Sequence, residues 1–219
     1  MKGYHIKEYY PNNFMRSYTD ADLCLDKENL IKAKPIMESM GYTLNNTTSY
    51  HDEYEKDGFH IFELHSELVS DKEKYAGIFS DPFSKSDMHH SPTDFRLKPE
   101  YLYLHLFFHL YHHFNTTGCG IRLFADFLVL ENLSKDMDFT FIESVIKKQK
   151  MTEFYSTMKK LLRYFFYGED IESHIQYIAS YIFTNKTTGA YVKHVASLSF
   201  FGKVKYFLKN WFPSAKDLA

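Results

Sequence analysis

The spacing of apolar residues changes at Pro99. Before it, short segments such as 17–25 and 59–68 alternate between two faces, and a period of two predicts β-strands. After it the pattern is helical to the end of the chain, and Pro99 suits the first turn of a helix. Strands grouped first and helices grouped after them predict an α+β front and an all-α back.

The sequence divides accordingly into two predicted domains, residues 1–95 and residues 96–219, with residues 70–98 as the connection that carries the boundary. In the second domain we expect helices at 99–115, 119–133, 139–149, 152–167, 170–184 and 202–211.

In the first domain, Asp26 is placed to cap a helix that ends before Gly41, and Pro35 is expected to kink or divide that helix. Further short elements are expected as strands at 42–44 and 48–50, a charged turn at 52–58 and a short helix at 72–79.

Composition excludes several classes of protein. A formal charge of −2 gives no basic field for general nucleic-acid binding. Cys24 and Cys119 form no CxxC pair and no leader is visible, so we expect a reduced, cytoplasmic chain. The longest apolar stretch, 101–114, is interrupted by histidines and is shorter than the roughly 20 residues of a bilayer span, so no membrane span is expected.

The most informative motif is Asp20-Ala21-Asp22 in the strand 17–25. Two carboxylates at i and i+2 of a strand project from one face, about 7 Å apart along the chain. Mg²⁺ prefers such oxygen ligands, and two ions held together support phosphoryl or nucleotidyl transfer. The alternative is that both aspartates are solvated on an edge strand.

Glu63 is placed to be a third acid, because it stands among apolar residues in the segment Ile61-Phe62-Glu63-Leu64. A buried carboxylate there needs a cation or hydrogen-bond donors. The alternative is a structural pair with a nearby lysine or histidine.

An ordered set of motifs resembles the uncharacterised bacterial nucleotidyltransferase family of the polymerase-β-like superfamily. The motifs, in sequence order, are Lys2-Gly3, Arg16-x-x-x-Asp20-x-Asp22-Leu23, Gly41-Tyr42, Phe62-Glu63-Leu64-His65, the histidine-rich helix, and Gly120-Ile121-Arg122-Leu123-x-x-Asp126. The resemblance covers nearly the whole chain.

The resemblance implies a small mixed sheet that bears the metal-binding Asp-x-Asp, preceded by a glycine turn near the triphosphate and followed by helices. It implies that Asp20, Asp22 and Glu63 bind Mg²⁺, with Mn²⁺ possible, and catalyse nucleoside monophosphate transfer from an NTP to an unknown acceptor. Gly3 would belong to the turn on the phosphate side. Arg16 would steady a phosphate, its alternative role being a surface ion pair.

Two departures from the family pattern favour an alternative function. Gly3 stands almost at the start, so the family's leading helix is expected to be missing, and Tyr4 after Gly3 is bulky for a site near phosphates. The alternative is a catalytically inactive binding or regulatory protein of the same fold, working with a separately encoded partner protein.

Histidines gather in the helix expected at 99–115. His105, His109 and His112 have the spacing i, i+4 and i+7, which places them on one helix face. Two histidines at i and i+4 can bind Zn²⁺, but the glutamate base of HExxH is missing here. Histidines that line an interhelical cleft are the competing interpretation.

Overall fold

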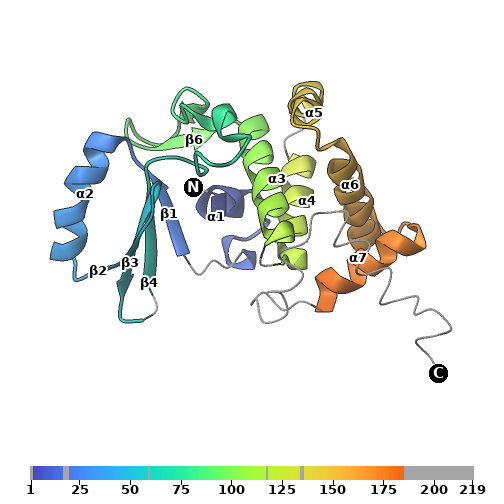
Figure 1. Ribbon diagram of the computed structural model, residues 1–219, viewed down its shortest axis with the longest axis horizontal. Coiled ribbons are helices and arrows are strands. Elements are labelled where there is room, and N and C mark those ends of the chain that lie inside the picture. Colours follow the sequence, from blue (N-terminus) through green and yellow to red (C-terminus); the bar gives the residue numbers. More distant parts are fainter. Residues whose placement is uncertain (1, 17–19, 59, 117, 134–135, 185–219) are drawn as a thin grey trace. The chain divides into compact units, whose positions relative to one another are not determined.

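A computed structural model describes residues 2–16, 20–58, 60–116, 118–133 and 136–184, which form two compact units (Figure 1). The first unit contains the described residues up to His105 together with those of 129–139. The second contains the described residues of 106–128 and those from 140 onward. The predicted division at residue 95 stays a prediction.

The first unit is built on a mixed four-stranded sheet, as predicted. Its strands are β1 (Asp20–Cys24), β2 (Thr43–Thr47), β3 (His51–Lys56) and β4 (His60–His65), in the order β1-β4-β3-β2. β1 is parallel to β4, whereas the β2–β3 and β3–β4 pairs are antiparallel.

Helix α2 (Lys27–Ser39) covers one face of this sheet (Figure 1). Asp26 begins it as predicted, because its side chain accepts a hydrogen bond from the Asn29 amide at 2.8 Å. Met37 packs against Tyr54 and Leu64, which are each 1% exposed. Tyr54 of β3 and Leu64 of β4 thus face α2, and strand alternation leaves the residues next to them to the other face.

Gly41 ends α2 with φ +83°, where a side chain would be strained. The expected division of α2 at Pro35 is wrong, because α2 runs unbroken through that residue. Pro35 has no N–H group, so the carbonyl of Ile31, one turn earlier, lacks its helical hydrogen bond. Ile31 is 69% exposed. Water can take the place of the missing donor on this exposed side.

The expected charged turn at 52–58 is also wrong. Strand β3 occupies most of it, and the turn is confined to Asp57 and Gly58 at positive φ. Asp52 and Tyr54 face α2 and are buried, and Lys34 of α2 lies 3.0 Å from the Asp52 carboxylate. A partner on α2 thus makes a charged segment compatible with a central strand.

The rest of the first unit contains α1 (Lys2–Ile6), the 3₁₀ helices η1 (Lys7–Tyr9), η2 (Asn13–Met15) and η3 (Ala76–Phe79), and the hairpin β5 (Ser86–Met88) and β6 (Phe95–Leu97). Buried Arg96 of β6 forms ion pairs with Glu8 and Asp94. Beside it, burial above all lowers the pKa of His5 to about 3, with neighbouring positive charges such as Arg96 adding to the effect.

Five predicted helices are confirmed: α3 (Pro99–Asn115), α4 (Ile121–Leu133), α5 (Phe139–Lys148), α6 (Thr152–Tyr167) and α7 (Ser173–Thr184). In the second unit the ring of Phe107 packs against Phe154 and Tyr155, and Phe124 packs against Phe165. The helix expected at 202–211 lies outside the described residues. Within the described ranges, no helix is both long and apolar enough to span a membrane.

Leu64→Ala should lower the free energy of unfolding by about 2–5 kcal/mol, because it leaves a cavity between β4 and α2. Urea denaturation measures the change. Leu44→Ala on β2 is the matched control, since Leu44 is 44% exposed and its truncation should cost within about 0.5 kcal/mol. Equal losses in the two variants would show that Leu64 does not anchor this core.

His5 should make the fold acid-sensitive. Its pKa rises from about 3 in the folded state to about 6.5 on unfolding, so the unfolded chain binds the extra proton between these pH values. Stability is therefore complete above pH 6.5 and falls on acidification, by at most about 1.4 kcal/mol per pH unit. Urea denaturation at pH 7, 6 and 5 should show a shallower fall in His5→Gln, and an unchanged slope would contradict the buried, neutral His5.

Candidate active site

Two acids meet where β1 pairs with β4. Asp22 lies opposite Glu63 in the parallel register, and both side chains are on the face of the sheet turned away from α2. Asp22 is 8% exposed and the Glu63 side chain is 22% exposed. Strand alternation produces this arrangement, because burial of Leu64 against α2 turns its neighbour Glu63 to the opposite face.

His65 joins the two acids. Its Nε2 lies 3.3 Å from Asp22 Oδ1 and 3.1 Å from Glu63 Oε2. Burial lowers the pKa of His65, but the hydrogen bonds and negative charges of Asp22 and Glu63 outweigh burial, so that the pKa is raised above its usual value. A protonated His65 therefore offsets the repulsion between two neighbouring carboxylates.

The ligand atoms of these three residues all lie within 4.8 Å of one another. We call them the Asp22–Glu63–His65 cluster. Once His65 has given up its proton, two carboxylate oxygens and one imidazole nitrogen, partly open to solvent through Glu63, form a donor set that fits one divalent cation. The carboxylates suit Mg²⁺ and Mn²⁺, and the imidazole adds affinity for the transition metals.

Asp20 shares the face of Asp22 but is not part of this cluster. In the register it lies opposite Ile61, two residue pairs before the pair of Asp22 and Glu63. Its Cα is therefore about 7 Å from that of Asp22 along the strand. Asp20 as a metal ligand remains a prediction.

The predicted turn at Gly3 is wrong, because Gly3 lies within the short helix α1. The segment Lys2–Ile6 forms a helix instead of a turn. This helix, α1, lies beside β1 (Figure 1). Arg16 is 7% exposed and follows η2, four residues before Asp20. The predicted contacts of Gly3 and Arg16 with a phosphate remain untested.

His65 is the member of the cluster to which the sequence interpretation gave no role. The signal was present, since Glu63 and His65 are two residues apart in a strand and must share a face. What the sequence did not provide was the register that sets both beside Asp22.

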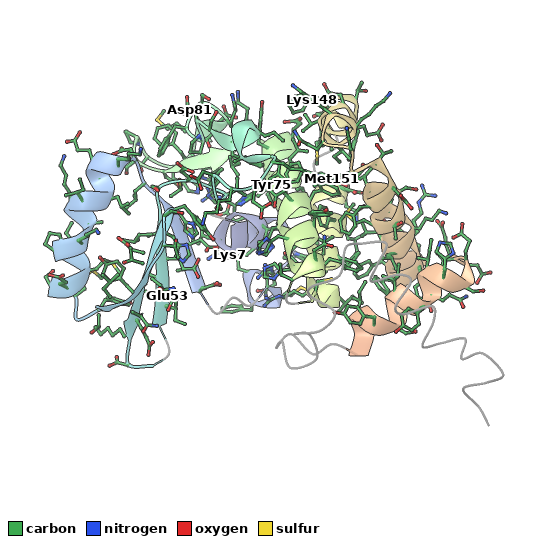
Figure 2. All side chains as sticks on the ribbon, viewed as in Figure 1. Lys7, Glu53, Tyr75, Asp81, Lys148 and Met151 are labelled. Carbon is green, nitrogen blue, oxygen red and sulfur yellow. The ribbon has the colours of Figure 1, made fainter. Side chains whose placement is uncertain are left out.

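The neighbouring strand β3 adds polar groups to the same face. Glu53, labelled in Figure 2, is opposite Glu63. The side-chain amide of Asn45 donates a hydrogen bond to the Glu53 carboxylate at 2.6 Å. The ring of His51 lies 5.1 Å from that of His65. Glu53 thus provides an acidic neighbour that is outside the cluster, which makes it a matched control for mutation.

His105, His109 and His112, for which the sequence leaves open Zn²⁺ binding or the lining of a cleft, do not form a three-residue metal site. In the part of the chain that the structure describes, the Asp22–Glu63–His65 cluster is the one group of three or more such residues close enough to share an ion. The ring of His105 instead packs 5.5 Å from that of Phe79.

The model of a family described as "Uncharacterised nucleotidyltransferase" matches residues 1–167, which include the whole cluster. The chain belongs to this nucleotidyltransferase family. No protein with curated function matches the chain significantly, and no solved structure does. The match confirms the predicted resemblance to an uncharacterised nucleotidyltransferase family, and membership supports nucleotidyl transfer as the general class of activity.

Divalent metal should stabilise the protein through the cluster. Mn²⁺ at about 100 times its dissociation constant should add roughly 2.7 kcal/mol of apparent stability, seen as a rise in Tm. Asp22→Asn should abolish most of this rise, and Glu53→Gln should retain it because Glu53 lies outside the cluster. An equal rise in Tm in wild type and Asp22→Asn would show that Mn²⁺ binds outside the Asp22–Glu63–His65 cluster.

Proposed function

We propose that the protein is a Mg²⁺-dependent nucleotidyltransferase that moves a nucleoside monophosphate from an NTP to an acceptor hydroxyl or phosphate. The observation that carries the proposal is the convergence of Asp22, Glu63 and His65 within 4.8 Å, in a chain that belongs to a nucleotidyltransferase family.

Asp22 and Glu63 would hold the divalent ion, with Asp20 as a further ligand from the same strand face. Mg²⁺ is the expected ion and Mn²⁺ a substitute, since both accept carboxylate oxygens. When bound, the ion supplies positive charge that polarises the phosphates and offsets the charge that develops during transfer.

The reaction is an in-line displacement at the α-phosphorus. An acceptor oxygen forms a bond to that phosphorus, and the bond from the α-phosphorus to the oxygen bridging to the β-phosphate breaks. Pyrophosphate leaves with the electron pair of this bond. The acceptor's proton, where it has one, passes to a base.

Glu63 is the base proposed to accept this proton from the acceptor. Its side chain is the more exposed of the two carboxylates, 22% against 6% for the Asp22 side chain, so an acceptor can reach it. His65 contacts both carboxylates and would fix their orientation. Gly3 and Arg16 are proposed on the triphosphate side, as the family resemblance implies.

Glu63→Gln should lower transfer by about 10²–10⁴-fold, the usual loss on removing a general base. The assay incubates the purified chain with Mg²⁺, an extract of candidate acceptors and each NTP labelled at the α-phosphate, and it follows label transfer and pyrophosphate. Calorimetry with a nonhydrolysable NTP should show that the variant still binds nucleotide.

Glu53→Gln is the control and should be as active as wild type, because Glu53 is on the same face without being in the cluster. An active Glu63→Gln variant would contradict the role of Glu63. Nucleotide binding without transfer from any of the four NTPs would instead support an inactive, nucleotide-binding member of the family.

A further inference from the structure

A second pair of converging metal ligands lies in the last two turns of α3, within the second unit. His109 and His113 are one helical turn apart, and their Nε2 atoms are 2.9 Å from each other. Their rings are 4.2 Å apart between centroids. Neither residue is part of the Asp22–Glu63–His65 cluster, and the proposed transfer reaction does not use them.

We propose that His109 and His113 together chelate a transition-metal ion of the Cu²⁺ or Ni²⁺ type. Between two neutral imidazoles, a hydrogen bond at this distance requires one Nε2 to donate and the other to accept. If the donor ring carries its proton on Nδ1 instead, both Nε2 atoms present a lone pair toward the space between the two rings. An ion can then bind both Nε2 atoms while both rings stay neutral and each keeps its proton on Nδ1.

The distance between the nitrogens indicates the class of metal. With metal–nitrogen bonds of about 2.0–2.1 Å, two nitrogens about 2.9 Å apart subtend roughly 90° at the ion, whereas a tetrahedral angle needs about 3.3–3.4 Å. The observed 2.9 Å therefore suits neighbouring positions of a square-planar or tetragonal site. Such geometry is typical of Cu²⁺ and Ni²⁺, which also bind imidazole more strongly than the earlier divalent metals.

The local structure suits a cation as well. His109 and His113 are both half-buried, so that water can complete the coordination shell. The His113 carbonyl accepts the amide of Gly118 at 2.8 Å, and the Asn115 side chain donates to the Tyr111 carbonyl. These bonds fix the end of α3, where the helix dipole places partial negative charge.

Calorimetric titration of the untagged, full chain with Ni²⁺ tests the site. All samples carry Glu63→Gln, so that the Asp22–Glu63–His65 cluster contributes equally to each. Adding His109→Gln or His113→Gln should weaken the tightest binding by more than the 10–100-fold that loss of a supporting group alone costs. Adding His112→Gln should leave it unchanged, because His112 is exposed and outside the pair.

Equal Ni²⁺ affinity and stoichiometry in the His109→Gln and His112→Gln samples would overturn the proposal. A second measurement needs no variant: Cu²⁺ added to the ¹⁵N-labelled wild-type chain should broaden the side-chain NMR signals of His109 and His113, in addition to any broadening at His65 of the Asp22–Glu63–His65 cluster. Broadening at other histidines, with these two unaffected, would also overturn it. Neither experiment depends on nucleotidyl transfer.

Discussion

The parallel pairing of β1 with β4 is the interaction on which the candidate site depends. It sets Asp22 beside Glu63, and the next residue of the same face, His65, contacts both. Two carboxylates this close and this far out of water repel each other; their hydrogen bonds and charges raise the pKa of His65, whose protonated form offsets the repulsion. The apolar core beneath the sheet supports the arrangement. Leu64, which stands between Glu63 and His65 in the sequence, packs against α2 and so turns both of its neighbours to the opposite face.

Periodicity predicted much of the fold. The five helices from Pro99 onward were placed within one to three residues, since each has a continuous apolar face and clear end signals. Asp26 and Gly41 correctly marked the two ends of α2. The sequence also indicated Glu63 as an acid on a strand neighbouring that of Asp22, although it did not provide the register that pairs them.

The rest required tertiary information. Local composition made residues 52–58 resemble a turn, but burial of Asp52 against Lys34 and of Tyr54 in the core makes most of the segment a strand. Gly3 resembled a turn residue and is helical. The role of His65 depended on a register between strands distant in the sequence, which no local pattern contains. The same limit kept the histidines of α3 ambiguous, because spacing alone does not separate the His109–His113 pair from His105 and His112.

The parallel pair also has a consequence for the order of assembly. The hairpins β2–β3 and β3–β4 join segments adjacent in the chain, whereas β1 and β4 meet across about 40 intervening residues. Closing that long loop costs more entropy than forming either hairpin, so β1 is expected to dock late in folding. Nascent chains that end before Glu63 lack two of the three residues of the Asp22–Glu63–His65 cluster, so an ion bound by the cluster could not act as a template for the early hairpins. An ion at the cluster would stabilise the sheet only after β1 has paired with β4.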